Sequence, residues 1–187
     1  MNLPNKLTIS RIFLTILFIG LLFLNGVWMK SLALVVFLAA ALTDYWDGKI
    51  ARERGQITPF GQLMDPIADK FLTLSAFISF VQMEILPAWM VIVIIARDAL
   101  VTSLRLSLPQ QKSENVESRQ SGKQKTAFQI FSIVCILFFL VVKETAYWRP
   151  EWTPRVLSFI YCGILFIVAV TVWSGARYLA KNRSHFG

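Results

Sequence analysis

Four aspartates form the part of this 187-residue chain best suited to chemistry. Asp44 and Asp47 stand three residues apart, and Asp65 and Asp69 stand four residues apart. On α-helices these spacings place both members of each pair on one face. The intervening residues 53–59 include a glycine and a proline, which is typical of one helix ending and another beginning. The sequence therefore predicts two consecutive antiparallel helices whose aspartates face each other.

Small residues share these two helix faces. By helical spacing, Gly48 and Ala51 lie beside the first pair of aspartates and Gly61 lies beside the second. Because glycine leaves the backbone open to close approach, a nucleotide diphosphate could lie directly against both helices. With Arg52, the whole pattern reads D-x2-D-G-x2-A-R-x8-G-x3-D-x3-D.

Four carboxylates gathered in one place repel each other and require a cation between them. Oxygen ligands without histidine or cysteine favour hard divalent ions such as Mg²⁺ or Mn²⁺. Two such ions, bridged by shared carboxylates, could clamp the attacking and leaving oxygens of a phosphoryl displacement. The pattern therefore indicates a metal-dependent phosphoryl displacement.

Each aspartate taken alone also has an ordinary structural explanation. Asp65 precedes Pro66 and is suited to a helix N-cap, with proline in the first helical position. Asp47 is suited to an ion pair with Lys49 or Arg52 on a protein surface. The complete set of eight spaced positions is hard to explain in this way, so a shared polar site is favoured.

The composition places these helices in a membrane protein. Hydrophobic residues make up 56% of the chain, whereas soluble domains contain about 45–50%. They form long blocks, such as residues 12–29 and 156–176, and apolar blocks of about 18 or more residues are typical of membrane-spanning helices. We expect the first block to be retained, because it is long for a signal peptide and further blocks follow it. An aspartate at the centre of such a helix costs roughly 2.5–3.5 kcal/mol to insert, so the four must line a polar cavity.

We therefore expect an all-α integral membrane protein with six transmembrane helices. A short interfacial helix over residues 1–11 precedes them, and residues 1–187 form a single domain. The predicted spans are residues 12–29, 31–54, 60–84, 88–108, 124–146 and 155–178.

The distribution of positive charge predicts the orientation. Of the Lys and Arg residues that flank the spans, thirteen fall on one side of the membrane and four on the other. The positive-inside rule then puts both termini and the polar loop 108–124 in the cytoplasm. Anionic headgroups and topology account for the net charge of +8, so we expect no nucleic-acid partner. Four tryptophans fall at the predicted outer ends of the spans, as an aromatic belt requires: Trp28, Trp89, Trp148 and Trp152.

The aspartate pattern resembles the signature of the CDP-alcohol phosphotransferase family, with every position filled. The common core of this family is six transmembrane helices with the motif on the second and third, so the resemblance covers the whole chain. It implies an enzyme of phospholipid biosynthesis in the cytoplasmic (inner) membrane of a bacterium, with its active site facing the cytoplasm. It also implies two divalent ions, Mg²⁺ or Mn²⁺, as cofactors, and a homodimer as the assembly.

The resemblance also implies a role for each position of the motif. Asp69 is the residue that deprotonates the acceptor hydroxyl. A carboxylate is a weak base for an alcohol, so proximity and metal coordination must supply the rest. The implied metal ligands are Asp44, Asp47, Asp65 and Asp69. The implied CDP-binding positions are Asp44, Gly48, Ala51, Arg52 and Gly61.

Basic residues later in the chain indicate how the acceptor is held. Arg97 lies inside the fourth predicted span, where a lone charge is costly and usually functional. Arg105 lies two turns further along, and Lys123 and Lys125 begin the fifth span. Because guanidinium groups bind phosphate oxygens through paired hydrogen bonds, we expect these residues to bind an acceptor phosphate or the donor diphosphate. The alternatives are topology-setting charge for the lysines and, for Arg97, an ion pair with Asp98 or another carboxylate.

Three flanking stretches narrow the choice of acceptor. Residues 2–11, 96–98 and 122–129 resemble bacterial members of the family that use glycerol 3-phosphate. This implies that CDP-diacylglycerol and glycerol 3-phosphate are the substrates, with membrane lipids around them. Phosphatidylglycerol phosphate and CMP are then the products.

Other functions stay open at the level of sequence. A sibling enzyme would use inositol phosphate or another alcohol, since the motif fixes the reaction type and not the acceptor. A cation channel or transporter also places carboxylates inside the membrane, but it leaves Gly48, Ala51 and Arg52 unexplained. A catalytically inactive scaffold leaves the complete set of carboxylates unexplained.

Overall fold

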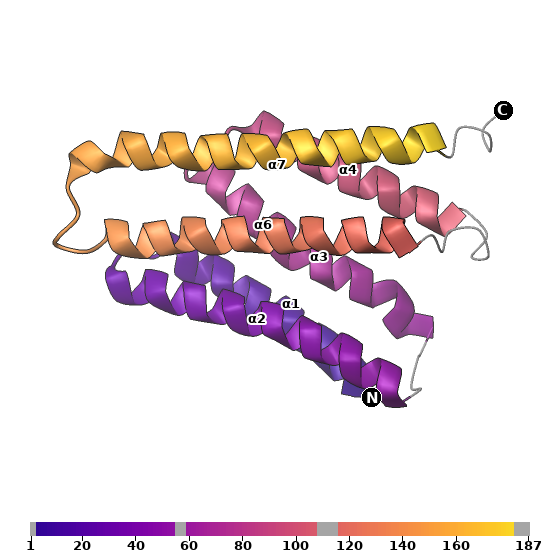
Figure 1. Ribbon diagram of the computed structural model, residues 1–187. Coiled ribbons are helices and arrows are strands. Elements are labelled where there is room, and N and C mark those ends of the chain that lie inside the picture. Colours follow the sequence, from indigo (N-terminus) through magenta and orange to yellow (C-terminus); the bar gives the residue numbers. More distant parts are fainter. Residues whose placement is uncertain (1–2, 55–58, 108–115, 182–187) are drawn as a thin grey trace. The chain divides into compact units, whose positions relative to one another are not determined.

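Helices joined by short connections make up the described part of the computed structural model, which covers residues 3–54, 59–107 and 116–181 (Figure 1). Side chains are described for residues 10–43, 70–100 and 127–176. No strand occurs within these ranges, so the all-α prediction is confirmed. The helices are α1 (Leu3–Phe23), α2 (Val27–Arg54), α3 (Pro59–Gln82), α4 (Ala88–Ser107), α6 (Val116–Lys143), the short 3-10 helix η1 (Pro150–Trp152) and α7 (Thr153–Lys181).

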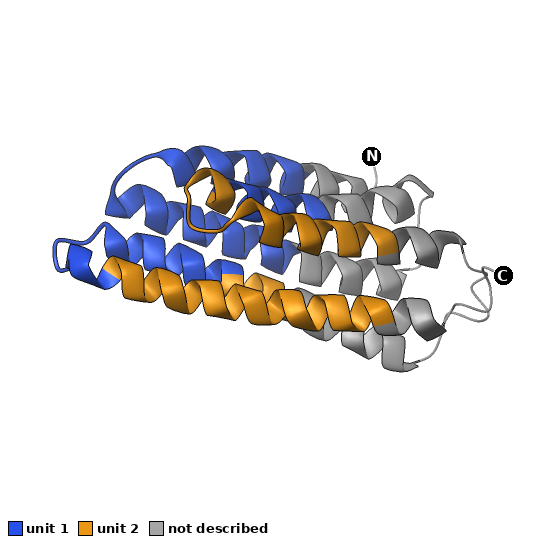
Figure 2. Cartoon of the chain, turned by 90° about the horizontal axis from the view of Figure 1, so that it is seen from above, with its two compact units in different colours: residues 1–79, 133–152 blue, residues 80–132, 153–187 orange. Residues whose placement is uncertain are grey.

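The chain divides into two compact units, drawn in blue and orange in Figure 2. One consists of residues 1–79 and 133–152, and the other of residues 80–132 and 153–187. In the first unit α1 packs against α2, and the rings of Phe18 and Phe37 meet with their centroids 5.4 Å apart. In the second unit α4 packs against α7. The single domain expected from the sequence stays a prediction.

One segment of the described residues, 150–176, is both long and apolar enough to cross a membrane. Its side chains also suit lipid, because Phe159, Phe166 and Trp173 recur every seven residues and are 81%, 65% and 74% exposed. An apolar stripe of this size is unusual on a soluble protein. Shorter apolar stretches lie at residues 10–23, 27–43, 70–82 and 127–143.

The helices that carry these shorter stretches extend beyond them. For example, α2 contains 28 residues, which is about 42 Å at a rise of about 1.5 Å per residue. The hydrocarbon core of a bilayer is about 30 Å thick. The number of spans therefore stays a prediction that is compatible with the observed helix lengths.

The predicted interfacial helix over residues 1–11 is not a separate element. A single helix, α1, runs from Leu3 to Phe23. Pro4 lies in its first turn, where the missing N–H has no intrahelical partner to lose. Residues 5–11 contain neither glycine nor proline, so nothing in the sequence stops the helix before the apolar block begins.

The first predicted span, residues 12–29, ends too late, because the chain turns at Asn25-Gly26. Gly26 has a φ of 109°, a conformation that favours glycine. Its carbonyl accepts hydrogen bonds from the N–H groups of Met29 and Lys30, both at 3.1 Å, and so begins α2. The Asn-Gly pair is itself a turn signal, although it lies within the apolar block.

Side chains hold this turn from both sides. The Gly26 N–H donates to Glu144 Oε2 at 3.3 Å, which ties the turn to the residue after α6. The buried Lys30 ammonium donates to the Leu22 carbonyl in the last turn of α1. A cation at a helix C-terminus satisfies an unpaired carbonyl and complements the helix dipole.

Replacing Gly26 with alanine should destabilise the protein by about 1–3 kcal/mol, because a Cβ strains a backbone at this φ. The apparent unfolding midpoint in detergent should fall by about 3–10 °C. Gly20→Ala is the matched control, because Gly20 lies inside α1 with open space where a Cβ would be. That variant should be equal to the wild type or slightly more stable. Equal midpoints for the two variants would contradict the assigned role of Gly26.

The predicted polar loop 108–124 is too long, because the helix that carries the fifth predicted span begins before that span. α6 starts at Val116, so residues 116–124 are helical, while residues 108–115 lie outside the described residues. Residues 116–124 are polar, but they include Glu, Arg, Gln and Lys and lack proline. These residues support a helix without supporting membrane insertion. The change from polar to apolar residues marks the start of the apolar stretch, and the helix begins before it.

Candidate functional site

The aspartate pattern falls on α2 and α3, as the sequence predicts. Asp44 and Asp47 belong to the second half of α2, and Asp65 and Asp69 to the first half of α3. The predicted helix break is confirmed, because α2 ends at Arg54 and α3 begins at Pro59. α3 then runs back in the opposite direction to α2 (Figure 1).

The side chains at positions 44–69 lie outside the described residues. The roles predicted for the aspartates and for Gly48, Ala51, Arg52 and Gly61 therefore stay predictions. Among the side chains that are described, no group of three or more His, Cys, Asp or Glu residues lies together.

Asp65 is not a helix N-cap. Because α3 begins at Pro59, both Asp65 and Pro66 lie inside the helix. The structural alternative weighed for Asp65 is therefore wrong. A proline inside a helix also removes one backbone hydrogen bond, which frees a carbonyl oxygen on the preceding turn.

Arg97 lies in the middle of α4 and pairs with the next residue. Its Nη1 is 2.9 Å from Asp98 Oδ1, and the two side chains are 17% and 24% exposed. The pairing with Asp98 that the sequence left open is thus confirmed. The other carboxylate oxygen, Oδ2, accepts a hydrogen bond from Gln129 Nε2 on α6 at 3.3 Å. Asp98 therefore joins the guanidinium of Arg97 to a second helix.

A third helix, α7, packs against the stem of Arg97. A Cβ atom at the buried Gly175 would lie 3.2 Å from Arg97 Cγ and 3.9 Å from its Nε. The Nε itself is buried and has no hydrogen-bond partner within the described part of the chain. A buried, unsatisfied donor costs about 1–3 kcal/mol. Leaving this N–H unpaired is therefore costly within the described part of the chain.

The Asp98–Gln129 contact also sets the register of α4 against α6. The chain segment between them joins the end of α4 to the start of α6. Toward that segment, Arg105 lies seven positions from Asp98 along α4, and Lys125 lies four positions from Gln129 along α6. Both spacings keep to one helix face. Lys123 precedes Gln129 by six positions, a spacing that leaves this face. The side chains of Arg105, Lys123 and Lys125 lie outside the described residues, so their predicted phosphate-binding roles stay predictions.

Two residues of this cluster were missed by sequence reasoning. Gln129 had a usable signal, because it stands one helical turn from Lys125 at the start of an apolar run. Gly175 had none, because a single glycine in an apolar helix looks the same whether or not a side chain packs on it.

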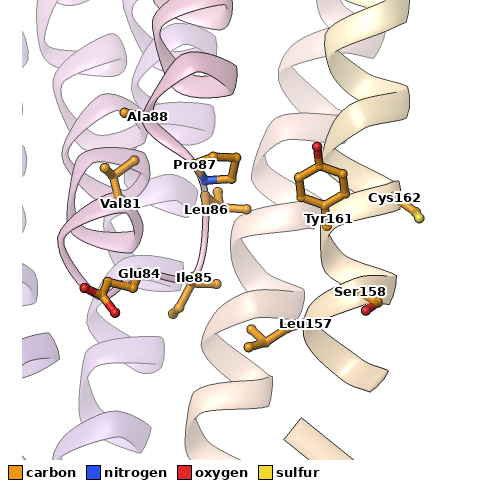
Figure 3. Close-up of a pocket in the computed structure, with 10 residues that line it drawn as sticks. All are labelled: Val81, Glu84, Ile85, Leu86, Pro87, Ala88, Leu157, Ser158, Tyr161 and Cys162. Atoms are coloured by element: carbon orange, nitrogen blue, oxygen red, sulfur yellow. The ribbon is translucent and has the colours of Figure 1, made fainter. Parts of the chain in front are cut away.

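A pocket of about 700 Å³ lies between the α3–α4 connection and the first turns of α7 (Figure 3). Leu86 and Pro87 stand on one side of it and Tyr161 on the other. Its lining is mainly apolar and includes one carboxylate, that of Glu84. None of the predicted catalytic, metal-binding or phosphate-binding residues lines it. This pocket therefore lacks the groups that phosphatidyl transfer requires.

Comparison with known proteins identifies a family and several near-full-length relatives. The family model for CDP-alcohol phosphatidyltransferase matches residues 1–173. A Bacillus subtilis protein named CDP-diacylglycerol--glycerol-3-phosphate 3-phosphatidyltransferase is 37% identical over 195 residues, covering 97% of this chain and 95% of the relative. Proteins of the same name from Yersinia pestis and Pectobacterium atrosepticum are each 33% identical, covering 96% and 97% of this chain and 93% and 95% of their own.

Proposed function

Since the chain belongs to the CDP-alcohol phosphatidyltransferase family, we propose that it transfers the phosphatidyl group of CDP-diacylglycerol to glycerol 3-phosphate. The products are phosphatidylglycerol phosphate and CMP. The observation that carries this proposal is the 37% identity, over 97% of the chain, to a relative whose name states both substrates. The complete aspartate pattern and the half-buried arginine of α4 support it independently.

The proposed reaction forms one bond and breaks one. The free hydroxyl oxygen of glycerol 3-phosphate attacks the phosphorus of the phosphatidyl group. The bond between that phosphorus and the CMP oxygen breaks, and CMP leaves with the electron pair. Asp69 takes the hydroxyl proton as the new bond forms, which raises the nucleophilicity of the oxygen.

The aspartate pattern supplies ligands that suit divalent metal ions. Asp44, Asp47, Asp65 and Asp69 are hard oxygen donors, and the described helices put two of them on each of two consecutive segments. When bound, Mg²⁺ or Mn²⁺ would offset the negative charge of the diphosphate. The positions that hold CDP are Asp44, Gly48, Ala51, Arg52 and Gly61, where small residues admit the nucleotide and a guanidinium offers paired donors.

The acceptor phosphate binds basic residues of α4 and α6 in this proposal. Arg97 supplies its Nε edge, while Asp98 occupies Nη1. Arg105 and Lys125 add positive charge from positions on the matched faces of the two helices, and Lys123 adds charge nearby. A phosphorylated acceptor gains from this arrangement, whereas an unphosphorylated alcohol does not.

The membrane arrangement is part of the proposal. Six transmembrane helices, a single domain and both termini in the cytoplasm agree with the positive-inside count, and the active site then faces the cytoplasm of a bacterial inner membrane. The positions of four tryptophans are compatible with an aromatic belt at the outer face of the membrane. Each of them stands near a helix terminus: Trp28, Trp89, Trp148 and Trp152. A homodimer is the expected assembly.

A headgroup-transfer assay tests the function. Purified protein in detergent should convert CDP-diacylglycerol and labelled glycerol 3-phosphate to labelled lipid and an equal amount of CMP when Mg²⁺ is present. A chelator should abolish both products, and Mg²⁺ or Mn²⁺ in excess should restore them. Transfer to inositol phosphate in preference to glycerol 3-phosphate would establish the sibling enzyme instead. Metal-dependent donor binding with no transfer to either acceptor would leave the family correct and both acceptors wrong.

A further inference from the structure

Residues from three helices, all within one compact unit, meet around a single guanidinium group. Arg97 comes from α4, Gln129 from α6 and Gly175 from α7, and Asp98 links the first two. Gln129 is 6% exposed, and Gly175 is buried. The cluster is therefore built into the packing of these helices.

The hydrogen bonds leave one edge of the Arg97 guanidinium unpaired. A guanidinium presents two forks of parallel N–H groups, and the fork that contains Nε is well matched to two oxygens of a phosphate. Asp98 bonds Nη1, so it does not use Nε. The Nε is buried, and no hydrogen bond to it is formed in the described structure.

We propose that Asp98, held in place by Gln129, is the positioning residue that turns the Nε edge of Arg97 toward the acceptor phosphate, with Gly175 making room for the arginine stem. This inference rests on the proposed function, because it assigns Arg97 to the phosphate of glycerol 3-phosphate. Neither Gln129 nor Gly175 needs to touch the ligand. Both act by limiting the rotamers of Arg97, so less freedom is lost when the phosphate binds.

The geometry gives each residue a separate task. Asp98 fixes the far end of the guanidinium at 2.9 Å, and Gln129 fixes the second oxygen of Asp98 at 3.3 Å. A side chain at position 175 would press on Arg97 Cγ at 3.2 Å and would tilt the arginine. Loss of any one constraint should weaken the acceptor complex while the donor site is left intact.

Steady-state kinetics of Gln129→Ala and Gly175→Ala tests this role. Each variant should raise the KM for glycerol 3-phosphate by about 3- to 10-fold, the equivalent of one neutral hydrogen bond. The KM for CDP-diacylglycerol and kcat should each stay within about twofold of the wild type. Gly163→Ala is the matched control for α7, because a Cβ at Gly163 meets nothing within 4 Å. It should leave all three parameters unchanged.

A double-mutant cycle separates positioning from a general structural effect. If Gln129 acts through Arg97, Gln129→Ala should have no further effect on the acceptor KM in an Arg97→Lys background. Additive effects, equal loss of kcat and affinity for both substrates, or an unchanged acceptor KM would each overturn the inference. Measured unfolding midpoints identify a variant that is merely unstable. Gln129→Asn keeps an amide, so its KM for glycerol 3-phosphate should lie between those of the wild type and Gln129→Ala. Absence of transfer by the wild type under the same conditions would instead refute the proposed function.

Discussion

Asp69→Asn should lower kcat by about 10²- to 10⁴-fold, the usual contribution of a positioned general base. The substitution keeps the size of the side chain and one oxygen that can bind a metal, but it removes the group that accepts the hydroxyl proton. Affinity for CDP-diacylglycerol should therefore fall much less than turnover. Single-turnover rates and equilibrium binding of the donor, both at saturating Mg²⁺, provide the two measurements.

Asp65→Asn is the comparison that separates loss of a general base from loss of a metal ligand. Asp65 is proposed as a metal ligand without a role in proton transfer, so its loss should weaken metal-dependent donor binding as well as turnover. Raised Mg²⁺ should recover part of the activity of Asp65→Asn and little of that of Asp69→Asn. A near-normal rate for Asp69→Asn would remove Asp69 from the base role, and equal recovery of both variants would make it a metal ligand only.

The sequence predicted helix identity better than helix ends, for a physical reason. Long apolar blocks can hardly form anything but helices in a membrane, since every backbone group must be bonded within its own segment. The ends depend on weaker local effects. At Gly26 a turn interrupts an apolar block, and at Val116 a helix begins in polar sequence. A hydropathy profile predicts neither the turn nor this helix start, because it reports the tendency to enter a membrane and not backbone hydrogen bonding.

In the candidate site, residue spacing predicts the positions of the aspartates, whereas the surroundings of Arg97 depend on helix packing. Spacing located the aspartates on two consecutive helices, and the observed bounds of α2 and α3 agree. The environment of Arg97 depends on which helices pack together, and no local pattern encodes that. Its partner Asp98 was one of several candidates, Gln129 comes from 31 residues away, and Gly175 acts by having no side chain.

Arg97→Lys should raise the KM for glycerol 3-phosphate by about 10- to 150-fold, the range expected when a hydrogen bond to a charged group is lost. Lysine keeps the positive charge beside Asp98 but lacks the planar fork that binds two phosphate oxygens. The KM for CDP-diacylglycerol should change by less than about twofold. Steady-state kinetics with each substrate varied in turn measures both values.

The lysine variant is preferred to Arg97→Met, because methionine would leave the half-buried carboxylate of Asp98 without its cationic partner. Removing one member of a buried pair costs about 3–5 kcal/mol, so Arg97→Met should lower the unfolding midpoint as well as the activity. Glycerol serves as the matched acceptor, since it has the hydroxyl groups and lacks the phosphate. If Arg97 binds that phosphate, any slow transfer to glycerol should be unaffected in Arg97→Lys, and the preference for glycerol 3-phosphate should shrink by the factor seen in KM. A parallel loss with both acceptors would instead place Arg97 on the donor diphosphate, which the same basic residues of α4 are also equipped to bind.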